Sequence, residues 1–140
     1  MIKHFFAVLA LIVIVGCSTM PVNELTAVPV PAERIYAPDM VLKQGDGKKA
    51  RVSFFRDEGF MGSACRYVIL VNNQKAFAIY PKEYIVLFLS PGPYFFRLET
   101  TGRGLCPNFS TSQNTILSEQ SEEGYRIMTT SGSLLLIRIK

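Results

Sequence analysis

Histidine is almost absent from this sequence of 140 residues, and its absence removes several classes of chemistry. The single histidine, His4, lies in an N-terminal segment that we expect to be cleaved off, so the mature chain would contain none. Without histidine the protein can build neither a Ser-His-Asp or Cys-His nucleophile system nor a histidine-based zinc site. We therefore predict no catalytic residues, no bound metal and no cofactor, and we expect a protein that is not an enzyme.

Charge of either sign is also sparse. Charged residues make up 19% of the chain, the formal net charge is +4, and no basic run is longer than Lys48-Lys49. So weak an excess argues against nucleic acid as a partner but suits contact with an anionic surface. Two adjacent acidic pairs, Asp57-Glu58 and Glu122-Glu123, are predicted to be solvated turns, because neighbouring carboxylates in an extended chain diverge and do not suit paired acid–base catalysis.

The one long apolar run is at the N-terminus, and it is too short to span a membrane. Phe5 to Val15 contains 11 consecutive apolar residues, which as a helix would cover roughly 17 Å, about half of a ~30 Å hydrocarbon core. This length, after a short cationic start, indicates a signal peptide over residues 1–16. The run ends in Ile14-Val15-Gly16-Cys17, which resembles the lipobox of bacterial lipoproteins.

The lipobox resemblance implies a location and a first partner. It implies cleavage before Cys17, lipid on the Cys17 sulfur, and anchoring of the protein in a lipid bilayer by its acyl chains. In enterobacterial-type lipoproteins an Asp in the next position commonly retains the protein at the inner membrane, so Ser18 favours the outer membrane, at its periplasmic face. The alternative is an ordinary secretory signal, or an uncleaved anchor, with an incidental cysteine.

Cysteine is scarce, and the count predicts a disulfide. Of the three cysteines, Cys17 is expected to carry lipid, which leaves Cys65 and Cys106 in an oxidising compartment. A bridge between them would raise the free energy of unfolding by about 4 kcal/mol in the chain-entropy model, because it closes a loop in the unfolded chain. The alternative is two unpaired, buried cysteines that behave as small hydrophobic residues.

Residues 17–49 show no regular hydrophobic period and are predicted to form an extended tether that begins at the lipidated cysteine. Twenty residues of polyproline-like chain would reach roughly 60 Å and hold the domain clear of the lipid surface. Residues 36–42 could still dock as an edge strand. The tether prediction rests on four prolines: Pro21, Pro29, Pro31 and Pro38.

Residues 50–140 contain short apolar runs separated by turns, a pattern typical of an all-β domain. No segment after Cys17 keeps a 3.6-residue period over ten residues. The strand at 84–89 is apolar on both faces and is expected to be central and doubly covered. The fold that we predict is a small antiparallel β-sandwich of about seven strands. The expected strands are 51–56, 65–71, 75–80, 84–89, 94–100, 115–119, 124–129 and 134–139.

Three local motifs extend this interpretation. They are the first strand from Arg51 to Phe55, the hairpin Val71-Asn72-Asn73, and the turn Pro91-Gly92-Pro93-Tyr94. Together they resemble a bacterial lipoprotein domain of unknown function that is similar to PEGA-type β-sandwiches. That family usually has Gly where Asn73 stands, and Asn tolerates the same positive φ. The resemblance covers about residues 49–140 and implies a fold, but it supplies no catalytic residues.

One surface patch follows from the predicted disulfide. If Cys65 and Cys106 are joined, the loops 57–64 and 102–108 must lie together at one end of the sandwich. Apolar side chains flanked by arginines are typical of a contact patch. The alternative is that the apolar residues of the first loop fold back as a lid on the core. The predicted patch consists of Asp57, Phe60, Met61, Arg66, Arg103 and Leu105.

These features predict a non-enzymatic binding or structural module for another envelope protein or a cell-wall glycan. An accessory lipoprotein of a secretion system is a related possibility. A second class is an inhibitor of a hydrolase such as lysozyme, which is disfavoured because such enzymes are often strongly basic and would meet like-charge repulsion. A carboxylate-dependent enzyme is a third class, disfavoured by the missing histidine and by the unsuited acidic pairs.

Overall fold

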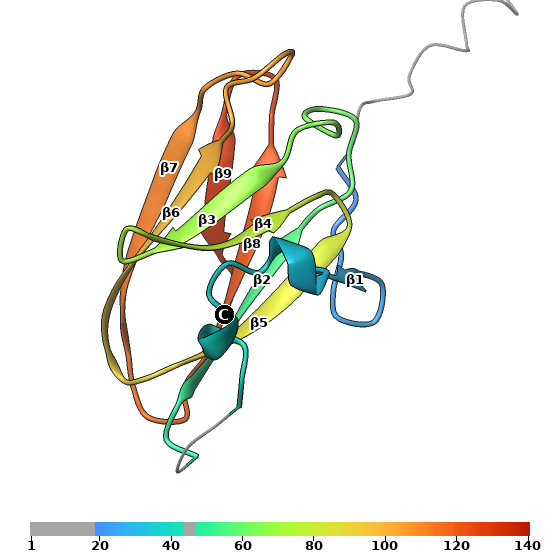
Figure 1. Cartoon of the computed structure of the whole chain (residues 1–140). Coiled ribbons are helices and arrows are strands. Elements are labelled where there is room, and N and C mark those ends of the chain that lie inside the picture. The colour runs from blue at the N-terminus through green and yellow to red at the C-terminus, as the bar shows by residue number, and fades with distance from the viewer. Residues whose placement is uncertain (1–18, 44–46) are drawn as a thin grey trace, which may run out of the picture.

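The computed structural model describes residues 19–43 and 47–140, and these residues form a two-layer β-sandwich (Figure 1). The all-β fold predicted from the sequence is confirmed. Two short 3-10 helices, η2 (Ala32–Arg34) and η3 (Pro38–Met40), precede the main strands. The strands of the described chain are β1 (Val28–Pro29), β2 (Ala50–Arg56), β3 (Tyr67–Val71), β4 (Gln74–Ile79), β5 (Glu83–Leu89), β6 (Gly92–Thr100), β7 (Ser110–Leu117), β8 (Glu122–Thr129) and β9 (Leu134–Arg138).

The two sheets have different connectivity. The four-stranded sheet has the order β4-β3-β6-β7 and is antiparallel throughout. The five-stranded sheet has the order β1-β5-β2-β8-β9 and contains two parallel pairs, β1 with β5 and β2 with β8. The prediction of a purely antiparallel sandwich is therefore wrong at these two pairs, which join segments that no short hairpin connects.

The core between the sheets is centred on aromatic rings. Phe54 of β2 packs against Phe77, Phe96 and Tyr125, with ring centroids 5.4, 5.3 and 5.3 Å away. All four rings are fully buried. Inward-facing residues alternate with outward-facing ones along β5 and β6, as expected of strands with one face on the core and one in solvent.

The predicted strands all form, with two differences in detail. β7 begins at Ser110, five residues before the expected start, because its first half is polar and exposed at a sheet edge and carries no apolar alternation. The strand that is buried along nearly its whole length is β2, at the centre of its sheet, and not the 84–89 segment. The hairpin turn uses positive φ at Asn72 (48°) and Asn73 (67°), as the sequence indicated.

The segment predicted to be a tether instead packs against the sandwich. Val22, Val30 and Ala37 are buried, and β1 adds an edge strand to the five-stranded sheet beside β5. Arg34 forms a two-point ion pair with Glu83, which fixes η2 on the domain. An extended spacer is therefore wrong for residues 20–43, because their scattered apolar side chains find places in and beside the core. The folded unit begins well before residue 50.

Several predictions concern residues outside those that the structure describes. These are the signal peptide (1–16), the lipidation site Cys17 and the adjacent Ser18. Within residues 19–43 and 47–140, no helix has the length and apolar character needed to cross a membrane. The lipid anchor therefore stays a prediction from the sequence.

Candidate functional site at the disulfide end

A disulfide joins Cys65 to Cys106, with the two Cα atoms 5.5 Å apart. The predicted pairing is confirmed. It brings together the loop before β3 (residues 57–66) and the loop between β6 and β7 (residues 101–109). The β8–β9 turn (130–133) lies at the same end, because Thr129 accepts or donates a 2.6 Å hydrogen bond with the Tyr67 hydroxyl. We call this group of three loops the disulfide end.

A buried arginine organises the 57–66 loop from inside. The Arg56 guanidinium donates hydrogen bonds to the backbone carbonyl oxygens of Cys65, Ile79 (2.9 Å) and Gly62 (2.6 Å). It also lies over the Tyr67 ring, 3.5 Å from the centroid. Desolvation by burial lowers the pKa of Arg56 to about 10, so the group stays charged at neutral pH. Arg56 therefore fixes the loop through main-chain atoms, and the loop side chains are not needed to hold its conformation.

Gly62 is the position where the loop needs a glycine. Its φ is +70°, and a Cβ atom there would lie 2.3 Å from the Tyr67 hydroxyl oxygen. Both the left-handed backbone and the close approach exclude a larger side chain. The loop can therefore pass tightly over Tyr67 while its carbonyl reaches Arg56.

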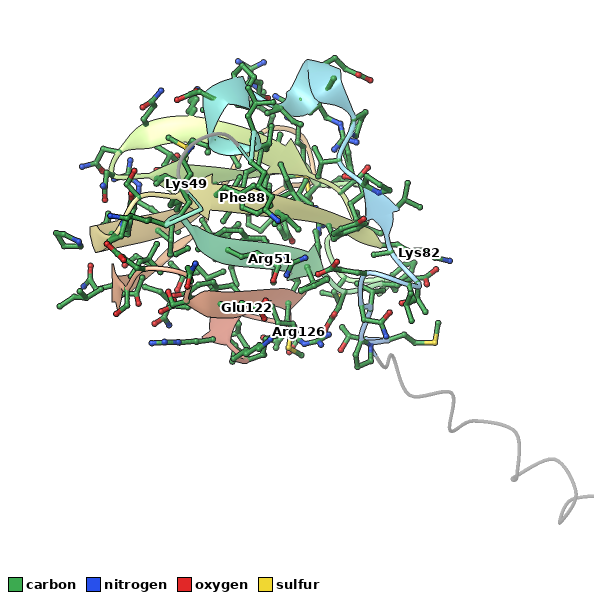
Figure 2. The ribbon with its side chains drawn as sticks, turned by 90° about the horizontal axis from the view of Figure 1, so that it is seen from below. Lys49, Arg51, Lys82, Phe88, Glu122 and Arg126 are labelled. Carbon is green, nitrogen blue, oxygen red and sulfur yellow. A yellow bond between two sulfur atoms is a disulfide. The ribbon has the colours of Figure 1, made fainter. Side chains whose placement is uncertain are left out.

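Asp57 is not part of the surface, which corrects its assignment to the contact patch and to a solvated turn. Its side chain is 1% exposed and forms an ion pair with Arg126 of β8. The same carboxylate oxygen accepts a hydrogen bond from the Val22 backbone N–H at 3.2 Å. Two partners that are distant in sequence thus draw the carboxylate inward. Figure 2 shows Arg126 and Lys82 toward the same end of the five-stranded sheet.

The apolar residues of the loop point outward. Phe60 is 80% exposed and Met61 is 42% exposed, so the alternative of a lid folded onto the core is wrong. Both side chains line a depression together with Thr19, the first described residue, and with residues 128–131. Leu105 is fully exposed on the second loop. Three of the predicted patch residues therefore present apolar surface at the disulfide end.

The two arginines of the predicted patch border a different surface. Arg66 and Arg103 line a groove of about 670 Å³ on the outer side of the four-stranded sheet, which we call the cationic groove. Neither forms an ion pair with another described residue, whereas Glu99 in the same groove pairs with Arg97 at 2.8 Å. The groove therefore carries an unbalanced positive charge. It is lined by Tyr36, Arg66, Val68, Lys75, Glu99, Thr100, Thr101 and Arg103.

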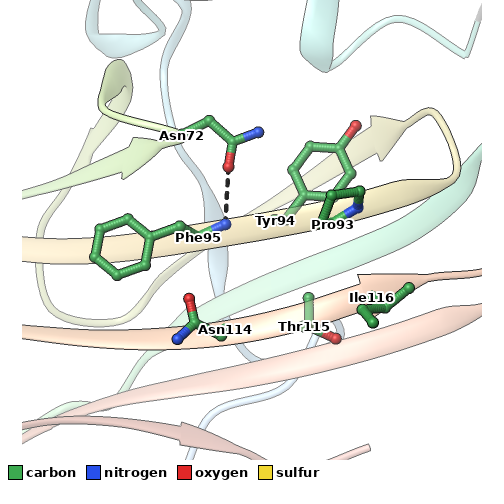
Figure 3. Close-up of a pocket in the computed structure, with 7 residues that line it drawn as sticks. All are labelled: Asn72, Pro93, Tyr94, Phe95, Asn114, Thr115 and Ile116. Atoms are coloured by element: carbon green, nitrogen blue, oxygen red, sulfur yellow. Dashed lines mark hydrogen bonds between the residues drawn. The ribbon is translucent and has the colours of Figure 1, made fainter.

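A second, more apolar groove of about 730 Å³ crosses β6 and β7 (Figure 3). Asn72 of the β3–β4 turn holds one side of it, because its side-chain oxygen accepts a 2.8 Å hydrogen bond from the Phe95 N–H. Ile116, 78% exposed on the edge strand, lies on the other side. This surface offers van der Waals contact and few charged groups. No sequence pattern indicates this groove, because its lining comes from three separate segments.

Glu123 is a buried carboxylate that the sequence analysis assigned to a solvated turn. It lies at the start of β8, where it accepts hydrogen bonds from the Thr115 hydroxyl (2.8 Å), the Tyr125 hydroxyl (2.7 Å) and Arg138 (2.7 Å). Burial and the adjacent carboxylate raise the pKa of Tyr125. Every oxygen of Glu123 is thus occupied by a protein donor. The arrangement is that of a structural anchor for β7, β8 and β9.

Comparison with known proteins adds no family to these observations: no protein-family model matches the chain, and no curated protein matches it. Within the part of the chain that the structure describes, no group of three or more histidine, cysteine, aspartate or glutamate side chains is placed to hold a metal ion. The features that can suggest a function are therefore the disulfide end, the cationic groove and the N-terminal sequence.

Proposed function

We propose that this protein is a bacterial envelope lipoprotein, held on a membrane by lipid on Cys17, whose β-sandwich is a non-enzymatic binding module. The observation that carries the proposal is the sequence Ile14-Val15-Gly16-Cys17 at the end of an apolar run of signal-peptide length. Ser18 favours the outer membrane, at the periplasmic face. The resemblance to lipoprotein domains of the PEGA-like type belongs to the same proposal.

The cysteines support export. The disulfide uses Cys65 and Cys106, so Cys17 is the one cysteine left for acylation. Structural disulfides form and persist in oxidising compartments such as the bacterial periplasm and are rare in the cytosol. A chain with this disulfide and with a lipobox-like sequence fits an exported protein, at the outer face of the inner membrane or further out in the envelope.

The cationic groove supports a binding role. Arg66, Lys75 and Arg103 outnumber Glu99, whose charge is balanced by Arg97, and Tyr36 supplies an aromatic surface beside them. Negatively charged groups of an envelope protein or of a cell-wall glycan complement such a groove. A strongly basic hydrolase such as lysozyme would be repelled by it, which disfavours the inhibitor hypothesis.

The anchor is tested by replacing the acylated atom. In the Cys17→Ser variant, we expect the processed, acylated form to disappear, because serine cannot form the thioether that peptidase cleavage follows. Mass spectrometry of the membrane and soluble fractions measures this, and Ser18→Ala, which keeps the sulfur, serves as the matched control. A Cys17→Ser protein that stays in the membrane fraction at its normal processed mass would refute the proposal.

A further inference from the structure

The described chain begins in direct contact with the 57–66 loop. Met20 and Glu58 form an antiparallel bridge with backbone hydrogen bonds of 2.6 and 3.1 Å. At Gly59 a Cβ atom would lie 2.9 Å from the Thr19 side chain, so the two segments are packed as closely as a glycine permits. Thr19 is therefore fixed beside the residue that precedes Phe60.

Covalent geometry leaves little distance between this contact and the proposed lipid. Cys17 precedes Thr19 by two residues, and two residues of fully extended chain span at most about 7 Å. Because residues 20–43 pack on the sandwich, no spacer is available downstream either. Lipid on Cys17 would consequently hold the disulfide end at the surface of the bilayer.

The side chains at that position suit a bilayer interface. We propose that Phe60 and Met61 insert into the membrane beside the acylated Cys17, as a second contact that orients the domain on the lipid. This inference rests on the proposed lipid anchor and deepens it. Phe60 is 80% exposed with no role in the core, and an exposed aromatic–thioether pair beside an acyl chain gains free energy by entering the lipid.

The base of the loop is held by contacts that do not involve the side chain at its tip, Phe60. Arg56 holds the loop through the carbonyls of Gly62 and Cys65, the disulfide fixes its C-terminal end, and Asp57 is tied to Arg126. None of these contacts uses the side chain of Phe60. The tip can therefore transfer into lipid without loss of the interactions that maintain the fold.

The absence of tryptophan from the chain gives a direct test, because a Phe60→Trp variant introduces the only tryptophan. The acylated full-length mature protein is reconstituted into vesicles of phosphatidylethanolamine and phosphatidylglycerol whose acyl chains carry bromine near the headgroup. We expect at least a roughly twofold loss of tryptophan fluorescence relative to unbrominated vesicles, because interfacial side chains lie about 5–10 Å into the headgroup–acyl boundary. The control is Ile116→Trp, equally exposed but on β7 at the other end of the sandwich.

The outcomes separate this inference from the anchor on which it rests. Quenching in Phe60→Trp but not in Ile116→Trp supports insertion. Acylation verified by mass spectrometry, with no quenching in Phe60→Trp or with equal quenching in both variants, overturns the insertion and leaves the anchor intact. That result would indicate that the loop faces water or a protein partner. A protein recovered without acyl chains overturns both proposals.

Discussion

The two ends of the sandwich each bury a charged side chain, but they satisfy it in different ways. At the disulfide end, Arg56 donates to main-chain carbonyls, and a covalent bridge closes the loops around it. At the other end, which we call the far end, Glu123 accepts from the side chains of Thr115, Tyr125 and Arg138. The first arrangement fixes the backbone, and the second depends on the identity of three neighbouring side chains.

This difference decides where the surface is free to carry function. Because Arg56 and the disulfide hold the loops of the disulfide end through main-chain and sulfur atoms, the outward side chains there contribute little to the fold. Phe60 and Leu105 are exposed, and Arg66 and Arg103 have no ion-pair partner among the described residues. Around Glu123 at the far end, the polar side chains of Thr115, Tyr125 and Arg138 are engaged with the carboxylate and hold the fold together. The comparison predicts different costs for substitutions at the two ends.

The largest effect on stability is expected from removing the covalent bridge. Replacing both Cys65 and Cys106 by Ala should lower the free energy of unfolding by about 4 kcal/mol, because the bridge spans 41 residues of sequence and restricts the unfolded chain. Denaturant unfolding followed by circular dichroism measures the change, with the oxidised, disulfide-bonded wild type as reference. A loss below about 1 kcal/mol would mean that Arg56 alone suffices to hold this end.

A smaller effect is expected at the far end from Glu123→Gln. The amide keeps one acceptor oxygen but turns an N–H group toward the hydroxyl and guanidinium donors, which should cost about 2 kcal/mol. The matched control is Glu122→Gln, the adjacent exposed carboxylate paired with Lys140, for which we expect a much smaller change. Equal losses in the two variants, measured by the same unfolding experiment, would contradict the anchoring role of Glu123.

The smallest change in stability, and the largest in binding, is expected from Arg66→Glu combined with Arg103→Glu. Both side chains are exposed, so the free energy of unfolding should change by less than about 0.5 kcal/mol. Reversing the charge of the cationic groove should abolish cross-linking to an envelope protein in intact cells, or co-sedimentation with cell-wall glycan. Lys43→Glu, exposed and outside the groove, is the control. Unchanged capture by the double variant would exclude the groove as the binding site.

The sandwich could be predicted because most of its strands are recognisable in the sequence as short apolar or alternating runs between turns. It could not predict that residues 20–43 would join the domain, because that depends on a pair such as Arg34 and Glu83, 49 residues apart. The burial of two carboxylates could not be predicted for the same reason. Asp57 is drawn inward by Arg126, which lies 69 residues away, and only the fold brings the two together. The disulfide was predictable because counting cysteines requires no geometry.

The parallel pairing of β2 with β8 has a consequence for the order in which the protein can be assembled. Ser53 of β2 lies opposite Gly124 of β8, so the middle strand of the larger sheet obtains its second neighbour only when residues 122–129 have been synthesised. Long-range strand pairing of this kind is slow and cooperative. A growing chain that has not yet reached β8 therefore exposes one edge of β2, its most buried strand.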